Sequence, residues 1–134
     1  MTWYAAHLIL YYKVVEGEQD SFLCHENIVV LDADNEDLAY KEADRIGHFQ
    51  AENSGDLQLV GEEHAPRQAT AIFAGVRKLM LCQRVPPEVL MREEDAPPYL
   101  LSGSEVTYSR LVVDNEQDVL ALANGDAVTV LYEE

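Results

Sequence analysis

Four charged residues in otherwise apolar segments are the candidates for chemistry: Glu26, Arg77, Lys78 and Glu105. Strand alternation would place Glu26 on one face with Phe22, Cys24, Ile28 and Val30. A carboxylate on such a face needs a cationic partner, and Arg77 is the first choice. Lys78 takes that role if a bulge at Gly75 shifts the register, and Glu105 begins a strand expected nearby. The sequence therefore predicts a partly buried polar cluster around Glu26.

Two interpretations of this cluster stay open. In the first, which we prefer, an internal Glu26–Arg77 pair fixes the register of two strands. In the second, Glu26, Arg77 and Glu105 line the cleft of a small enzyme. Desolvation often cancels the Coulomb gain of such a pair, whereas removing one partner leaves the other charge buried alone. Substituting Glu26 by glutamine separates the two interpretations.

Other catalytic and metal-binding patterns are absent from the sequence. Cys24 and His25 are adjacent, so a strand would point them to opposite faces and away from a shared ion. The remaining histidines stand alone in the sequence: His7, His48 and His64. The chain has neither a GxSxG elbow nor a phosphate-binding GxxxxGK loop. We therefore expect no metal, no cofactor and no assigned catalytic residue, and a non-enzyme is favoured over an enzyme.

Charge and length narrow the class of protein. The 134 residues include 25 acidic and 9 basic side chains, a formal charge of −16. This charge repels nucleic-acid phosphates and anionic membranes, so we expect neither as a partner. Cys24 and Cys82 lie far apart, which favours reduced, buried thiols in a cytoplasmic protein. The apolar run Trp3 to Val15 lacks a basic leader and is too short for a membrane helix.

Local patterns predict the elements that position these residues. Alternating or β-branched runs predict strands over Trp3 to Val15, Phe22 to Ala33, Leu57 to Val60, Gln68 to Gln83, Glu105 to Val113 and Ala127 to Tyr132. The irregular, Pro-rich loop 84–102 separates the fourth and fifth strands. We expect residues 1–134 to form a single α+β domain, a largely antiparallel sheet of five or six strands with two helices packed on it.

Two Asp-Asn pairs mark the starts of the helices. Asp34-Asn35 and Asp114-Asn115 can each accept hydrogen bonds from the first free backbone N–H groups. The first helix should carry a stripe of small residues to the sheet and continue through Gly47 to about Ala51. The second should bury its inner stripe and end at Asn124-Gly125: Val119, Leu122 and Ala123.

Aromatic and apolar side chains suggest an interface. The face of the first strand with Trp3, Ile9 and Tyr11 is mixed but too apolar to lie wholly in water, and Tyr99 could pin down the Pro-rich loop. These residues are the candidate contacts with a protein partner. They also suggest a homodimer, in which a second copy would cover the second face or the free edge of that strand.

Four blocks of sequence resemble a bacterial family catalogued as domain of unknown function 4288. They are Trp3-Tyr4-Ala5-Ala6-His7-Leu8, Glu26-Asn27-Ile28-Val29, Phe73-Ala74-Gly75-Val76-Arg77-Lys78-Leu79 and Glu105-Val106-Thr107-Tyr108-Ser109. The resemblance implies a bacterial cytosolic protein and supplies no activity or catalytic residue. From the residues themselves, we expect a small acidic protein-binding module without catalytic activity, in a regulatory or toxin-neutralising role. The alternative is the small enzyme described above.

Overall fold

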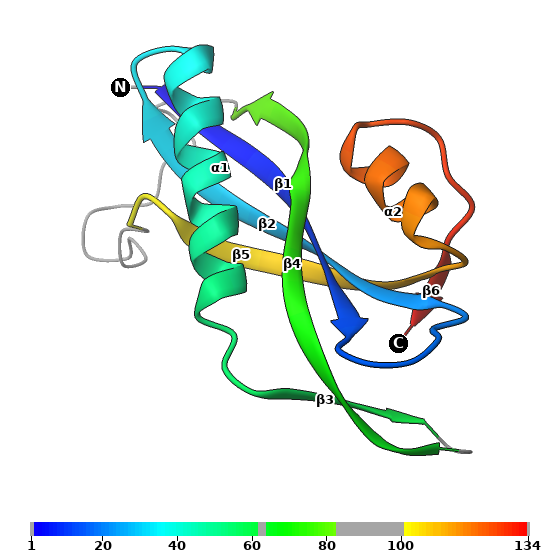
Figure 1. The fold of residues 1–134 in the computed structure, drawn as a ribbon. Coiled ribbons are helices and arrows are strands. Elements are labelled where there is room, and N and C mark those ends of the chain that lie inside the picture. Colours follow the sequence, from blue (N-terminus) through cyan, green and yellow to red (C-terminus); the bar gives the residue numbers. More distant parts are fainter. Residues whose placement is uncertain (1, 62–63, 83–100, 134) are drawn as a thin grey trace, which may run out of the picture.

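Alternating apolar residues build a six-stranded antiparallel sheet with two helices, an α+β fold (Figure 1). The computed structural model describes residues 2–61, 64–82 and 101–133. The elements are β1 (Thr2–Val14), β2 (Phe22–Ala33), α1 (Glu36–Glu52), β3 (Leu57–Gly61), β4 (His64–Leu81), β5 (Ser104–Val113), α2 (Glu116–Ala123) and β6 (Leu131–Glu133). The strand order is β3-β4-β1-β2-β5-β6.

The central strand β1 has apolar side chains on both faces, and each face packs against a different helix. Tyr4, Ala6, Leu8 and Leu10 belong to the cluster under α1, and this side is called the α1 face. Ile9 and Tyr11 belong to the cluster under α2, and this side is called the α2 face. Leu8 and Ile9 have no exposed surface although they are neighbours in the chain. The fold therefore has two apolar layers, one on each face of the sheet.

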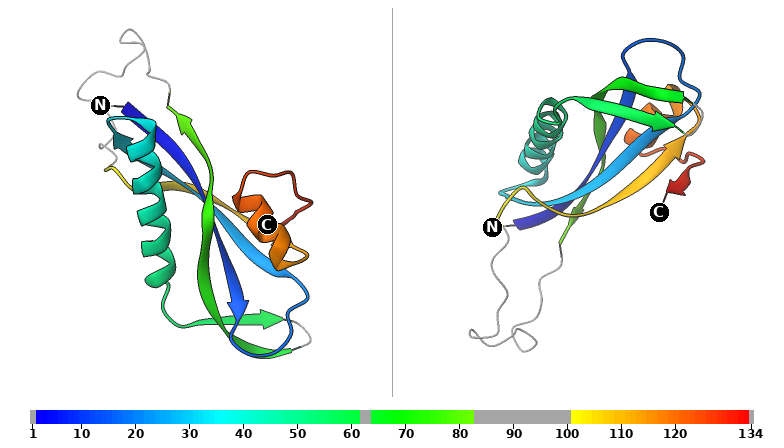
Figure 2. Two further views of the ribbon diagram at one scale, coloured as in Figure 1. Left: turned by 45° about the horizontal axis from the view of Figure 1, so that its top comes forward. Right: turned by 90° about the horizontal axis from the view of Figure 1, so that it is seen from below.

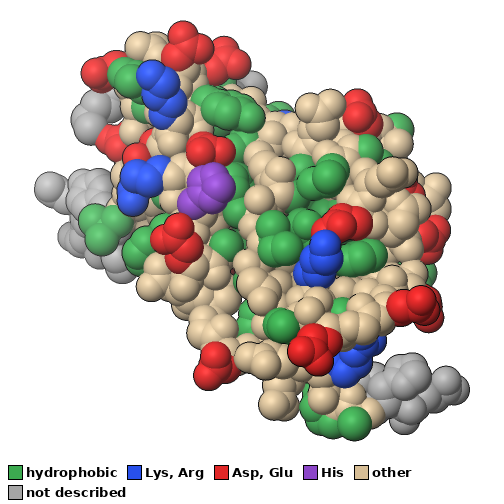
Figure 3. Space-filling model, viewed as in Figure 1, with side chains coloured by type: hydrophobic (Ala, Val, Ile, Leu, Met, Phe, Trp, Pro, Cys, Tyr) green, Lys and Arg blue, Asp and Glu red, His purple; other side chains and the backbone are tan. Residues whose placement is uncertain are grey.

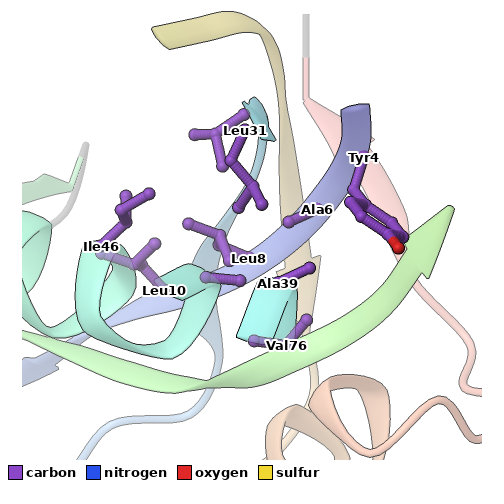
Figure 4. Packing of buried hydrophobic residues seen from close by; sticks show 10 residues of the cluster. Tyr4, Ala6, Leu8, Leu10, Leu31, Ala39, Ile46 and Val76 are labelled. Carbon is purple, nitrogen blue, oxygen red and sulfur yellow. The ribbon is translucent and has the colours of Figure 1, made fainter. Parts of the chain in front are cut away.

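The long helix α1 forms as its sequence predicts. Asn35 is the N-cap, and its side-chain oxygen accepts a hydrogen bond from the Leu38 N–H at 2.9 Å. The buried residues lie on one stripe: Ala39, Ala43, Ile46 and Gly47. Figure 4 shows Leu8 and Leu10 of β1 among Ala39 and Ile46 of this helix. The prediction that the helix continues through Gly47 is confirmed.

Gly47 permits a close approach between α1 and β4. A Cβ atom at this position would overlap the Phe73 ring, which packs against the α1-face cluster. Alanine usually stabilises a helix interior by about 1 kcal/mol relative to glycine. We expect Gly47→Ala instead to lower the free energy of unfolding by about 1–3 kcal/mol, because the ring must be displaced. Urea denaturation measures this.

The control is the double variant Gly47→Ala/Phe73→Leu. The smaller side chain should return part of the lost stability, giving a coupling energy between the two positions. If Gly47→Ala alone is more stable than the wild type, the close approach does not constrain the helix.

The short helix α2 closes the second layer. Asn115 caps it by accepting a hydrogen bond from the Asp118 N–H at 2.8 Å. Val119, Leu122 and Ala123 are buried, as predicted, against the α2 face. In Figure 1, β4 runs between the two helices. The Gly75 backbone of β4, at φ +149°, lies next to α2, where an added Cβ would be in van der Waals contact with that of Ala123 at 3.4 Å.

Two expectations about the C-terminal half need adjustment. The last strand covers only Leu131–Glu133, so the prediction of a strand from Ala127 is wrong. Val128 and Val130 instead pack, partly buried, against the α2-face cluster, so burial rather than strand pairing explains their apolar character. Residues 84–100 of the expected Pro-rich loop 84–102 lie outside the described residues, and so does Tyr99.

Candidate functional site

The polar cluster predicted around Glu26 is present on the α2 face. Its Oε2 lies 4.0 Å from Arg77 Nε, so Glu26 and Arg77 face each other as a long ion pair. Its Oε1 lies 3.4 Å from His7 Nδ1. The side chains of Glu26 and Arg77 are 21% and 23% exposed, so both charges are partly desolvated. One carboxylate therefore holds groups from two different strands.

Arg77 also holds the end of α2. Its Nη1 donates hydrogen bonds to the backbone oxygens of Leu122 and Asp126, the latter at 3.0 Å. Carbonyls in the last turn of a helix have no partner within the helix and carry the negative end of its dipole. A guanidinium donates hydrogen bonds to these carbonyls and also places a positive charge at the negative end of the dipole. Arg77 therefore links β4, β2 and the C-terminal end of α2.

Two bulges explain why Arg77 faces this cluster. Simple alternation from Phe73 and Leu79 would place Arg77 with them, but both of those residues pack on the α1 face. The β1–β4 ladder has an extra residue, Ala74, between Phe73 and Gly75, and a second extra residue, Arg77, between Val76 and Lys78. The expected face of Arg77 is thus wrong. The two bulges turn its side chain over, toward Glu26.

Glu105 does not join the cluster. In the β2–β5 ladder it lies opposite Val29, which belongs to the α1-face cluster, and opposite residues share a face. Glu26 lies on the other face, opposite Ser109. A register shift leaves Val106 as the extra residue and reverses the side of Glu105. The expected Glu26/Arg77/Glu105 cleft is therefore not formed.

Sequence reasoning missed His7 as a member of the cluster. His7 is 9% exposed and lies opposite Ile28 in β2 and Lys78 in β4. Alternation along β1 already placed it beside Ile9, but the sequence did not say which part of β2 it would meet. Lys78 is exposed, so it does not replace Arg77 as the partner of Glu26.

The interface candidates occupy different environments. Ile9 and Tyr11 are buried under α2, so the expectation that they form an open contact surface is wrong. The Tyr11 hydroxyl donates a hydrogen bond to Glu116 Oε2 at 2.7 Å, and Lys13 Nζ lies 3.0 Å from the same oxygen. Burial is the first cause of a raised Tyr11 pKa. Of the described candidates, Trp3 alone remains exposed, at 36%.

A second polar group lies on the α1 face beyond the end of α1. Tyr12 OH and His25 Nδ1 are 3.1 Å apart, and the rings of His25 and Tyr108 are centred 5.5 Å apart. Burial, followed by the nearby Arg110 charge, lowers the pKa of His25. A neutral His25 can accept a hydrogen bond from the Tyr12 hydroxyl at Nδ1. The sequence analysis did not identify this group.

The lowered pKa of His25 makes stability depend on pH. As the pH falls through the ordinary histidine range near 6.5, the unfolded chain binds a proton that the folded chain accepts only at lower pH. We therefore expect the wild type to lose stability relative to His25→Phe between about pH 7.5 and 5.5. Urea denaturation at several pH values measures the difference in the free energy of unfolding between the two proteins. A constant difference between the two proteins across this range would contradict the prediction.

Cys24 and His25 point to opposite faces, and this separation argues against a shared metal ion. Cys24 is in the α2-face cluster, whereas His25 contacts Tyr12 on the α1 face. Within residues 2–61, 64–82 and 101–133, no three His, Cys, Asp or Glu side chains are grouped to hold a metal. Burial raises the pKa of the Cys24 thiol to about 12.

The two cysteines should react at different rates. Cys24 is buried and protonated, while Cys82 is partly exposed. We expect iodoacetamide to modify Cys82 first in the native protein and Cys24 only as fast as the fold opens. Mass spectrometry of peptides at successive times measures both rates. Equal labelling of both thiols in the native protein would contradict the buried position of Cys24.

Comparison with known proteins places the chain in a family. A family model described as a domain of unknown function, DUF4288, matches residues 3–79. The chain belongs to this family. The matched DUF4288 region contains His7, Glu26 and Arg77 but ends before β5 and α2. No curated protein and no solved structure matches the chain.

Among the residues that the structure describes, no helix is both long enough and apolar enough to cross a membrane.

Proposed function

We propose that this protein is a non-catalytic module that binds another protein. The observation that carries the proposal is a group of large apolar side chains on the last two strands. Val106 and Tyr108 of β5 are about half exposed, and Leu131 and Tyr132 of β6 are more than two-thirds exposed. These four residues define the β5–β6 edge. Tyr132 lies opposite Leu111 of the α2-face cluster, and its neighbour Leu131 points to the other face, so the edge carries apolar groups on both faces. Exposed apolar groups along one edge are typical of an interaction surface.

The internal polar cluster supports the non-catalytic part of the proposal. Arg77 donates to two backbone oxygens and pairs with Glu26, so its charge serves the packing of α2. Glu105, the third member of the alternative enzyme cleft, lies on the opposite face. Because the cluster joins the sheet to the end of α2, a structural role is enough to account for its charged residues.

Charge narrows the class of partner. The formal charge of −16 disfavours nucleic acid and anionic membranes and favours a basic protein surface. Figure 3, in the view of Figure 1, shows acidic side chains spread over the visible surface of the molecule. Such a module suits a regulatory role in the cytoplasm or the neutralisation of a basic toxin.

Affinity capture with matched variants tests the proposal. Val106→Lys puts a charge on the β5–β6 edge, whereas Val60→Lys puts the same charge on β3, where Val60 is 77% exposed. We expect purified partner binding to be lost with the first variant and kept with the second. If no specific partner is captured and a metabolite screen finds substrate-dependent turnover, the alternative enzyme is favoured.

Homodimerisation stays a prediction, but its surface changes. The expectation that the first strand has a free edge is wrong, because β1 pairs with β2 on one side and with β4 on the other. Since α2 also covers Ile9 and Tyr11, the exposed Trp3 is the only one of the described candidates that a second copy could still contact. Light scattering at micromolar concentration decides it. A mass that stays at 15.1 kDa would remove the homodimer.

A further inference from the structure

The outer edge of β5 is open over most of its length among the described strands. β6 pairs only with the stretch Arg110 to Val112, while β5 begins at Ser104. Figure 2 shows the short β6 beside only the last part of β5. The Ser104 N–H is occupied by the Leu101 oxygen, so the open stretch is Glu105 to Ser109. Outward backbone groups here can be satisfied by another strand.

From this edge we infer a docking site for an extended, basic segment of a partner protein, which adds to the sheet beside β5. The inference rests on the proposed protein-binding function and names its site and partner chemistry. In strand addition, backbone hydrogen bonds supply affinity and side chains on alternate positions supply specificity. Val106 and Tyr108 are the exposed apolar side chains on this stretch.

Charge at the start of β5 specifies the basic character of the segment. Glu105 is exposed on the open stretch. A hollow at the same end is lined by Asp32, Ala33, Asp34, Leu38, Glu42 and Ser102. Ser102 lies two residues before β5 and its Oγ accepts a hydrogen bond from the Asp32 N–H at 3.0 Å, so the hollow adjoins the edge. A lysine or arginine at the C-terminal end of an antiparallel segment would meet these carboxylates.

One other occupant and one other edge fit less well. A second copy of this chain would bring a further formal charge of −16 to an edge that is already acidic. The opposite edge of the sheet, β3, has no charged residue in the sequence Leu57-Gln58-Leu59-Val60-Gly61 that would select a partner.

Selection from random peptides displayed on phage tests the site with the full chain as target. We expect enriched peptides to combine β-branched residues with a lysine or arginine toward the C-terminal end. A synthetic copy of one selected peptide should slow amide hydrogen exchange at Thr107 to Ser109 and leave β3 unchanged. Enrichment of acidic peptides, protection elsewhere or no enrichment at all would overturn the inference.

Proline variants give the matched control. Thr107 and Tyr108 are adjacent, so one N–H points to β2 and the other to the open edge. Thr107→Pro and Tyr108→Pro are therefore made separately. The variant that removes the N–H of the open edge should keep the wild-type melting temperature and bind the peptide about tenfold or more weakly. Gln58→Pro and Leu59→Pro are the same change in β3. Whichever of these two variants keeps the wild-type melting temperature should bind the peptide with unchanged affinity.

Charge variants test the basic partner, and the natural partner separates this inference from the proposed function. Glu105→Gln and Asp34→Asn should each weaken binding of the selected peptide several-fold and reduce its dependence on salt. If the folded β5 proline variant still captures the natural partner, the docking site is wrong and the protein-binding function stands. If the wild type captures no specific partner, the proposed function itself fails. A dimer that the same proline converts to a monomer would assign the edge to a second copy.

Discussion

Arg77→Met should lower the free energy of unfolding by about 2–3 kcal/mol, below the range for a fully buried pair because both charges are partly exposed. Methionine keeps much of the apolar stem but removes the guanidinium. Glu26 would lose its cationic partner, and the oxygens of Leu122 and Asp126 would lose the guanidinium donor, while the Leu122 oxygen keeps the Gly125 N–H. Urea denaturation measures the loss, and hydrogen exchange should show α2 opening more often than α1.

A double-mutant cycle with Glu26→Gln shows whether the pair acts as a unit. Glutamine keeps the shape of the side chain and removes its charge, so the single change should cost less than Arg77→Met. Because each substitution removes the same ion pair, the double variant should lose less stability than the sum of the two. Arg77→Lys should recover only part of the loss, since one ammonium cannot reproduce the fork of a guanidinium. Fully additive losses would show that Arg77 acts only through the carbonyls.

The same variants decide between the structural and functional roles of Glu26. If Glu26→Gln lowers stability while partner binding survives in the folded fraction, the pair is structural. If the fold keeps its stability and binding disappears, the cluster belongs to a binding or catalytic site. If neither property changes, Glu26 makes no net contribution.

Leu8→Ala should lower the free energy of unfolding by about 2–5 kcal/mol, the range for a leucine removed from a close-packed core. Leu8 has no exposed surface and contributes to the α1-face cluster, so truncation leaves a cavity between β1 and α1. Denaturant unfolding with an unchanged m-value measures the change as stability alone.

Leu101→Ala is the matched control because Leu101 is 78% exposed. The same chemical change there should alter stability by less than about 0.5 kcal/mol. Ile9→Ala removes side-chain volume from the other layer, where Ile9 is also fully buried. A loss comparable to that of Leu8→Ala would show that both layers stabilise the fold. Equal effects of Leu8→Ala and Leu101→Ala would contradict the packing described here.

Features determined by neighbouring residues could be predicted from the sequence. Asn35 and Asn115 cap helices because a short polar side chain reaches an N–H three residues ahead. Alternation correctly separated Leu8 from Ile9, and helical spacing identified Val119 as an inner residue of α2. The α+β class and the antiparallel sheet follow from these local patterns together.

The tertiary structure decided how these elements meet. Alternation alone put Arg77 with Phe73, and only the two bulges in the β1–β4 ladder turned it toward Glu26. A bulge at Val106 in the β2–β5 ladder moved Glu105 to the opposite face. The position of each extra residue depends on the strand that pairs beside it, far away in the sequence. Strand alternation is a property of one chain segment, whereas register and bulges are properties of two, so the local sequence predicted the faces of the strands but not the members of the site.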